Sequence, residues 1–183
     1  TGYHNNAFGS QTLFFNTTGY DNVAIGHLTL HANTTGVNNV GVGSSALYSN
    51  INGGNNVALG YQSLFYNTTG SDNTGLGART LLYNTTGSNN VAVGKDALIT
   101  NTTGSYNTAV GYRALEKNVS GDYNNALGYA TLFSNTTGKY NTGFGHKVLY
   151  SNTTGNYNIG VGTEALYGNI SGSYNVGLGR KAL

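Results

Sequence analysis

The hydrophobic and polar residues of this chain recur with a period of seventeen. Counted from Gly2, the unit repeats ten times in full and then breaks off after twelve residues at Leu183. In every unit, positions 1 and 8 are Gly, position 4 is Asn, position 12 is Leu and position 7 is apolar. A fixed short period of this kind is the sequence signature of a stacked repeat architecture.

Positions 4 to 8 of the unit predict a short β-strand. The stretch from Asn22 to Gly26 reads Asn-Val-Ala-Ile-Gly, so that larger apolar residues alternate with a small one. This alternation places positions 5 and 7 on the same side of the strand. We expect position 7 to form the core together with the Leu of position 12. Position 6 is always Ala or Gly, and we expect it to form a surface that another chain approaches closely.

The rest of the unit favours a β-solenoid over a helical one. Seventeen residues are too few for the two-helix units of helical solenoids and suit one coil of a β-solenoid, stacked about 4.8 Å from the next. The segment from Tyr112 to Asn118 is too short to nucleate a helix, and we expect a strand or a tight bend there. The predicted fold is all-β: a single-stranded parallel β-solenoid of eleven coils. We expect one continuous repeat domain over residues 1–183, and we expect it to be a segment of a longer protein.

Stacking places equal unit positions above one another, so each position becomes a column along the rod. Asn at positions 4 and 15 is expected to form two ladders of hydrogen-bonded amides. The predicted core ladder is the Leu of position 12: Leu13, Leu30, Leu47, Leu64, Leu81, Leu98, Leu115, Leu132, Leu149, Leu166 and Leu183.

Two surface columns carry aromatic and charged side chains. We expect the tyrosines of position 3 to stack: Tyr106, Tyr123, Tyr140, Tyr157 and Tyr174. We also expect the charges of position 10 to alternate in sign, each between two opposite ones where charges are adjacent. From the fifth unit onward this column reads Arg79, Asp96, Arg113, Ala130, Lys147, Glu164 and Lys181.

The composition limits the chemistry that the chain can carry. Only 8% of the residues are charged, the net charge is +2 without a run of either sign, and Cys is absent. These features exclude a disulfide framework and the basic footprint of nucleic-acid binding. No apolar stretch is long enough to cross a membrane. We therefore expect no nucleic-acid partner and no direct membrane insertion of this segment.

The candidate catalytic side chains do not converge in any column. His4 occupies position 3, His27 and His146 occupy position 9, and His31 occupies position 13. The six acids form no pair at the spacing that a glycosidase needs. We predict that the chain is not an enzyme, that it has no catalytic, metal-binding or cofactor-binding residues, and that it needs no cofactor.

Nine Asn-x-Ser/Thr sequons occur, all at position 15: Asn16, Asn33, Asn67, Asn84, Asn101, Asn118, Asn135, Asn152 and Asn169. They are candidate glycosylation sites. The alternative is turn chemistry, in which Asn and Thr bond to nearby backbone and the Gly of position 1 supplies a positive φ. The threonine pairs also raise the minor alternative of an ice-binding surface. One argument speaks against it: neighbouring residues of a strand point in opposite directions, so the two threonines of a pair would not line one face.

Several units resemble the head repeats of trimeric autotransporter adhesins, the YadA-like family. The resemblance is carried by stretches such as Asn-Val-Ala-Leu-Gly at Asn56 to Gly60 and Asn-Thr-Ala-Val-Gly at Asn107 to Gly111. It implies a left-handed parallel β-roll, three chains side by side, and display on a bacterial surface to bind host matrix or other cells. The seventeen-residue unit is longer than the usual head repeat. The units also look like those of long bacterial surface proteins and phage tail fibres.

The leading hypothesis is a non-enzymatic, extracellular or cell-surface rod with a structural and adhesive role. We expect self-association, as a homotrimer or an end-to-end filament, and contacts with surface glycans or matrix proteins. The alternative is a phage tail-fibre segment that recognises a host surface glycan through Tyr at positions 3, 9 and 13. An ice-binding solenoid is the minor alternative.

Overall fold

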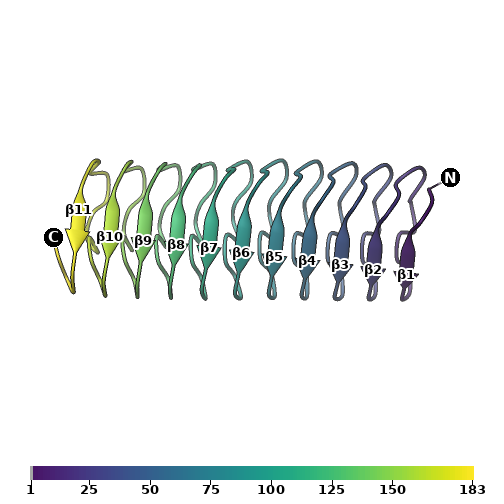
Figure 1. Ribbon diagram of the computed structural model, residues 1–183, viewed down its shortest axis with the longest axis horizontal. Helices are drawn as coiled ribbons and strands as arrows, with labels where there is room; N and C mark the ends of the chain where they lie inside the picture. Colours follow the sequence, from purple (N-terminus) through teal and green to yellow (C-terminus); the bar gives the residue numbers. More distant parts are fainter. Residues whose placement is uncertain (1) are drawn as a thin grey trace.

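The computed structural model describes residues 2–183 and shows a rod of stacked coils (Figure 1). The strands pair in chain order in one eleven-stranded sheet, and neighbouring strands run parallel. Each coil contributes one three-residue strand: β1 (Asn6–Phe8), β2 (Val23–Ile25), β3 (Val40–Val42), β4 (Val57–Leu59), β5 (Thr74–Leu76), β6 (Val91–Val93), β7 (Thr108–Val110), β8 (Asn125–Leu127), β9 (Thr142–Phe144), β10 (Ile159–Val161) and β11 (Val176–Leu178).

The register of the sheet equals the sequence period. Ala92 of β6 faces Ala109 of β7, seventeen residues on. Outside the strands the backbone also bonds from coil to coil, as where the Leu98 amide donates to the Ala114 carbonyl at 3.0 Å. The prediction of an all-β parallel solenoid with seventeen-residue coils is confirmed.

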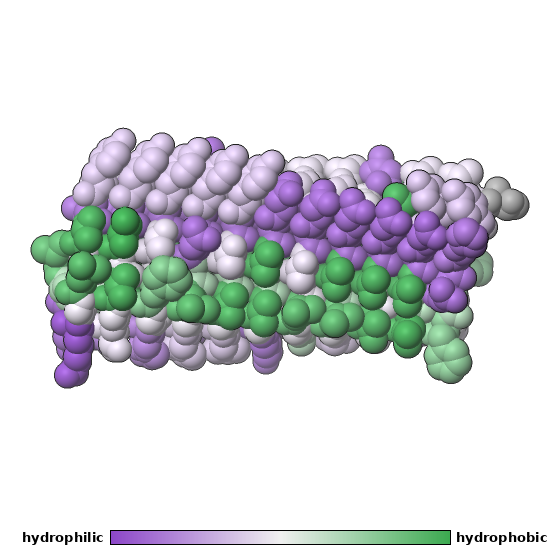
Figure 2. Space-filling model, viewed as in Figure 1, coloured by the Kyte–Doolittle hydropathy of each residue, from purple (hydrophilic) through white to green (hydrophobic). Residues whose placement is uncertain are grey.

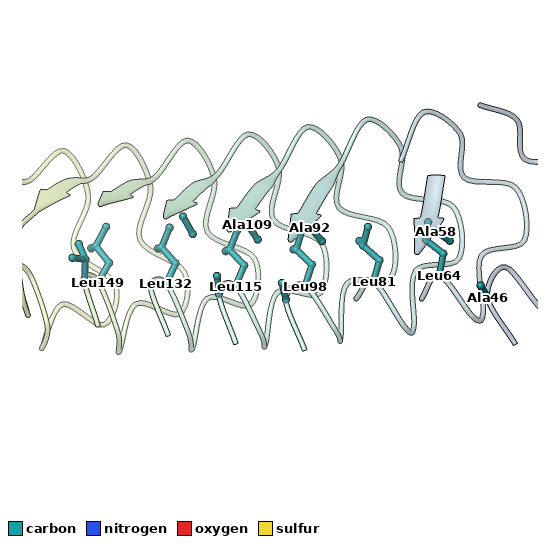
Figure 3. Close-up of a cluster of buried hydrophobic side chains, with 14 of the residues drawn as sticks. Ala46, Ala58, Leu64, Leu81, Ala92, Leu98, Ala109, Leu115, Leu132 and Leu149 are labelled. Atoms are coloured by element: carbon teal, nitrogen blue, oxygen red, sulfur yellow. The ribbon is translucent and has the colours of Figure 1, made fainter. Parts of the chain in front are cut away.

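Leu of position 12 fills the centre of the rod (Figure 3). The eight leucines of the second to ninth units, Leu30 through Leu149, are completely buried, and Leu166 is 3% exposed. At the two ends the ladder opens, since Leu13 is only partly buried and Leu183 is 80% exposed. Burying one leucine contributes about 1.5–3 kcal/mol, so this single column accounts for much of the apolar stabilisation.

The strand residues face the opposite way from the prediction. Ala92 at position 6 is completely buried, whereas Val91 at position 5 is 37% exposed. Position 6 therefore belongs to the core and is not the surface for another chain, and position 7 lies outside. The physical reason is the narrow interior. A Cβ added to Gly143 at position 6 would lie 2.6 Å from Cγ2 of Thr131, so only a small residue fits there.

Positions 9 to 13 form a tight bend without a strand. Alternate residues of this bend take the left-handed conformation, as Arg113 (φ 59°) and Leu115 (φ 51°) show. That conformation costs an L-residue about 1–2 kcal/mol, which the burial of the leucine offsets. The expected tight bend is present in Tyr112–Asn118, and the alternative of a strand is excluded.

Positions 1 and 8 of the unit are always glycine, for two different physical reasons. Gly94 at position 8 has φ 113°, a backbone region that only glycine adopts readily. Gly104 at position 1 does not have a positive φ, so the expectation that this glycine supplies a positive φ to the turn is wrong. It is needed for close approach, because an added Cβ would lie 2.5 Å from both Oδ1 of Asn101 and the carbonyl oxygen of Gly121.

Candidate interaction surfaces

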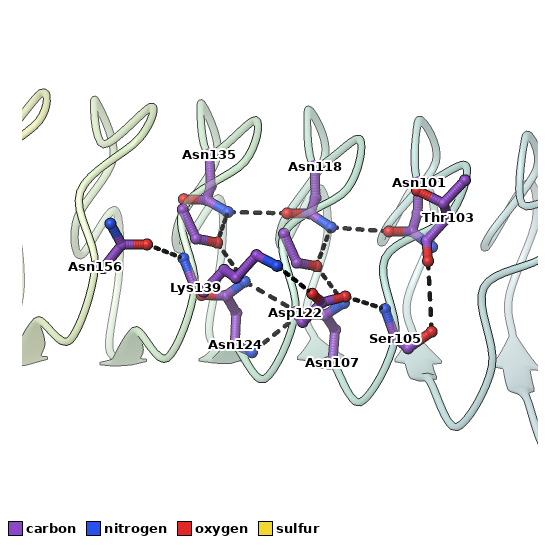
Figure 4. A network of polar contacts seen from close by, with 12 residues as sticks. Asn101, Thr103, Ser105, Asn107, Asn118, Asp122, Asn124, Asn135, Lys139 and Asn156 are labelled. Carbon is purple, nitrogen blue, oxygen red and sulfur yellow. Dashed lines mark hydrogen bonds and ion pairs between the residues drawn. The ribbon is translucent and has the colours of Figure 1, made fainter.

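The sequon asparagines lie inside the rod and form a ladder (Figure 4). Asn101 is completely buried, and its Nδ2 donates to Oδ1 of Asn84 at 2.8 Å and to the carbonyl of Gly104 at 2.9 Å. Its own Oδ1 accepts from Nδ2 of Asn118 at 2.8 Å. Both amide hydrogens are thus engaged.

The same burial applies to seven of the nine sequons, and only Asn16 and Asn169 in the end coils are half-buried. A glycan on Nδ2 would have to displace the ladder and occupy the core. The structure therefore argues against glycosylation of the folded rod at these positions and supports the alternative that these asparagines are structural.

Position 4 carries a second amide ladder. Nδ2 of Asn107 donates to Oδ1 of Asn90 at 3.2 Å and to the carbonyl of Gly121 at 2.8 Å. The backbone amide of Asn107 donates to the same Oδ1 at 3.0 Å. Among residues 2–183, no buried side-chain nitrogen or oxygen lacks a hydrogen-bond partner. The expected ladders at positions 4 and 15 are confirmed.

The charged column pairs less regularly than predicted. Arg79 donates from Nε and Nη2 to the two carboxylate oxygens of Asp96, at 2.8 and 2.9 Å. Arg113, the other expected neighbour of Asp96, instead pairs with Glu116 of its own coil. The hydrogen bond to Glu116 raises the pKa of Arg113 above its usual value. Lys181 and Glu164 of the same column also pair, at 3.6 Å. Opposite charges of adjacent units therefore pair at two places, but the prediction that each charge lies between two opposite ones is wrong at Arg113.

A further ion pair lies at position 2, and sequence reasoning missed it. Nζ of Lys139 donates to Oδ2 of Asp122 at 2.7 Å, and the backbone amide of Ser105 donates to Oδ1 at 2.9 Å (Figure 4). The hydrogen bond to Asp122 raises the pKa of Lys139 above its usual value. Both residues occupy the same position of adjacent units, a signal that a search of every column would have found.

Aromatic side chains stack along the surface. The predicted position 3 stack is confirmed: consecutive rings from Tyr106 to Tyr174 have centroids 4.8–5.0 Å apart and planes within 5° of parallel. A second stack, at position 13, runs from Phe14 through His31 and Tyr48 to Phe65. This stack was harder to see in the sequence because the residue type at position 13 changes from unit to unit.

The histidines remain apart in the folded chain. His4 contacts Asp21, His31 lies in the position 13 stack, and His146 stacks on Tyr129. Within residues 2–183, no three His, Asp or Glu side chains are grouped so that they could hold a metal ion. The described part of the chain also has no helix that could span a membrane.

An apolar band runs along the rod over the strands (Figure 2). Side chains of positions 5 and 7 form it, and we call it the outer sheet face. Its members include Phe8, Ile25, Leu59, Val91, Leu127, Phe144, Ile159, Val161, Val176 and Leu178, each more than a third exposed. No residue at positions 5 or 7 of any unit is ionisable.

A shallow groove of about 480 Å³ lies on another side of the coils, between the columns of positions 14 and 16. We call it the tyrosine groove. Tyr66 and Tyr83 stack beside it with centroids 5.4 Å apart. The residues lining it are Ser49, Tyr66, Thr68, Tyr83, Thr85, Thr100 and Thr102.

Comparison of the chain with protein-family models, with curated protein sequences and with solved structures finds no match. The fold itself, a parallel β-solenoid of repeated coils, is consistent with a structural repeat protein. The likeness to adhesin head repeats rests on the repeat sequence alone.

Proposed function

We propose that this chain is a non-enzymatic structural rod on the cell surface, or outside the cell, that packs laterally with copies of itself. The observation that supports this most is the outer sheet face, which is at least partly exposed in every coil of the rod. A monomer gains nothing from leaving this many β-branched and aromatic side chains in water. The proposal gives these side chains a partner surface.

The size of the face supports an interface. Eleven strands at about 4.8 Å spacing span about 50 Å, and three residues with their side chains are roughly 10 Å wide. The resulting area of about 500 Å² is near the upper end of the roughly 300–600 Å² that the largest apolar patch of a monomer covers. A stable dimer buries about 800 Å² per partner, so flanking columns must join the contact.

A second copy fits the face better than an unrelated partner does. No position 5 or position 7 residue, from Asn6 in the first coil to Leu178 in the last, is ionisable. Two copies can therefore meet through this face without charge repulsion and without desolvating an ion. Both copies also carry side chains at the same axial spacing. Three copies around one axis is the arrangement that the resemblance to adhesin heads implies, and end-to-end stacking is the alternative.

The extracellular and adhesive parts of the proposal rest on the resemblance of the repeats. The ice-binding alternative loses support. The hydroxyl of Thr85, at position 16, donates to the backbone carbonyl of Thr102 at 3.0 Å, and Thr68 and Thr102 bond to the next coil in the same way. These position 16 hydroxyls therefore have only their acceptor sites left for water.

Sedimentation equilibrium of the intact chain tests the self-association. We expect the wild type to associate, and the double variant Val91→Lys/Val93→Lys to be monomeric, because it places two charges in the middle of the outer sheet face. The matched control Thr86→Lys/Thr103→Lys adds the same charge at exposed position 17 and should associate like the wild type. Circular dichroism shows whether each variant keeps its sheet. A folded wild type that stays monomeric at high concentration, or equal weakening by both variants, would refute the proposal.

A further inference from the structure

The rings of the tyrosine groove differ from those of the position 3 column in how much of their faces neighbouring rings cover. In the position 3 column each inner ring is covered on both faces by its neighbours. In the groove only two rings stack, and position 14 is Ser49 in the coil before Tyr66 and Thr100 in the coil after Tyr83. No further ring of the column stacks on this pair, although Phe65 at position 13 contacts Tyr66 in a T-shaped arrangement with centroids 4.6 Å apart. Tyr66 and Tyr83 are 44% and 47% exposed.

The wall opposite the rings is apolar although it consists of threonines. The hydroxyl of Thr68 donates to the Thr85 carbonyl, and those of Thr85 and Thr102 donate to carbonyls of the next coils, all at 3.0 Å. Thr100, which follows Tyr83 in the column of the rings, likewise donates to the carbonyl of Glu116 at 2.6 Å. Because these hydroxyls bond to backbone, the threonines contribute mainly methyl groups to the groove.

The polar groups left for a ligand are few and neutral. The hydroxyls of Tyr66, Tyr83 and Ser49 are the side-chain oxygens of the lining without a hydrogen bond to the protein, since the four threonines bond to backbone carbonyls. No charged residue lines the groove. An anionic ligand would find no cation here, and a purely hydrocarbon ligand would bury three hydroxyls without partners.

We propose that the tyrosine groove binds an uncharged glycan. A pyranose ring has an apolar C–H face that stacks on an aromatic ring, and hydroxyls at its edge that bond to phenols and serine. Because Tyr66 and Tyr83 stack on each other from coil to coil, their outer faces look along the rod, and each face offers a surface for one sugar ring. The site lies at positions 14 and 16, not at the positions 3, 9 and 13 expected from the sequence.

The test measures binding of two neutral oligosaccharides, cellohexaose and chitohexaose, to the intact chain by isothermal titration calorimetry. Tyr66→Ser/Tyr83→Ser removes both rings, and the fold accepts serine at position 14, as Ser49 shows. We expect at least one of the two sugars to bind the wild type, with little dependence on salt, and this variant to bind it at least tenfold more weakly. The matched control Tyr112→Ser/Tyr129→Ser, at position 9, should bind like the wild type.

The proposal is wrong if neither hexasaccharide binds, if only an anionic glycan such as heparin binds, or if the control loses binding as much as the groove variant does. Self-association that disappears in Tyr66→Ser/Tyr83→Ser would also overturn it, since the groove would then be an interface between copies. The outer sheet face is untouched by these variants. A monomeric rod can therefore still bind sugar, and the two proposals fail separately.

Discussion

Removing one asparagine side chain from the position 4 ladder should destabilise the rod by more than the loss of one ordinary hydrogen bond does. Nδ2 of Asn90 donates to the Gly104 carbonyl at 2.9 Å and to Oδ1 of Asn73 at 3.1 Å, while its Oδ1 accepts from the Asn107 backbone amide at 3.0 Å. Asn90 is completely buried. In Asn90→Ala the Asn107 amide loses its protein acceptor.

The magnitude follows from counting the donors left unpaired. Two donors of Asn107 lose their partner, its backbone N–H and one Nδ2 hydrogen, because both bond to Oδ1 of Asn90. Each buried donor without a partner costs about 1–3 kcal/mol, so we expect a loss of about 2–6 kcal/mol in the free energy of unfolding. Even the lower value corresponds to about 30-fold faster exchange of protected amides, at about 1.4 kcal/mol per factor of ten.

Urea unfolding followed by circular dichroism measures the global effect, and hydrogen exchange of the Asn107 amide measures the local one. The second assay matters because long repeat arrays need not unfold as one unit. The control is Asn52→Ala, which removes an exposed asparagine at position 17, outside the outer sheet face, and should change stability by no more than about 0.5 kcal/mol. If both variants unfold and exchange alike, the amide ladder does not hold the coils together, and this reasoning fails.

Three further changes test other columns. Gly143→Ala should cost about 1–3 kcal/mol in urea unfolding, because the new Cβ collides with Cγ2 of Thr131; an unchanged midpoint would show that the interior is not narrow. Asn89→Tyr extends the position 3 stack onto Tyr106 and should stabilise by about 0.5–1.5 kcal/mol, and a lower melting temperature would speak against stacking. Lys139 has a raised pKa in the folded state, so its ion pair contributes below the ordinary lysine pKa of about 10.4 and is lost as pH rises through the raised value. The stability difference between wild type and Lys139→Met should thus be constant near neutral pH and vanish in strong alkali, whereas a difference that grows with pH would contradict this.

Much of the fold could be predicted from the sequence because the same residue recurs every seventeen positions, which strongly restricts which residues can stack on one another. An invariant Leu every seventeen residues has to meet itself when the coils stack, and Leu98 and Leu115 do lie in one buried column. Invariant Asn at two positions likewise forms two ladders, since an unpaired amide could not be tolerated at every coil. Period and register follow from these columns alone.

The direction of the strand side chains could not be predicted in the same way. Alternation fixes that positions 5 and 7 share a side, but not which side, and the usual rule buries the larger residues. In this rod the rule fails, since Ala92 is inside and Val91 is outside. The clue was the restriction of position 6 to Ala and Gly, which reflects a narrow interior filled from the opposite wall by residues such as Thr131.

The candidate sites were harder to predict because they depend on differences between coils. The tyrosine groove exists where two units carry Tyr at position 14 and their neighbours do not, as with Tyr66 beside Ser49. The pairing of Arg113 with Glu116 within one coil likewise depends on the bend between them. A consensus of the repeat averages such features away.

Electron cryo-microscopy of the assembled protein is the most direct test of a rod that packs through its sheet. The account predicts an axial repeat of about 4.8 Å and neighbouring copies whose strands β2 to β10 meet across the positions 5 and 7 columns. Images in which copies touch through the tyrosine groove, or in which the outer sheet face remains open to solvent in every assembled copy, would contradict it.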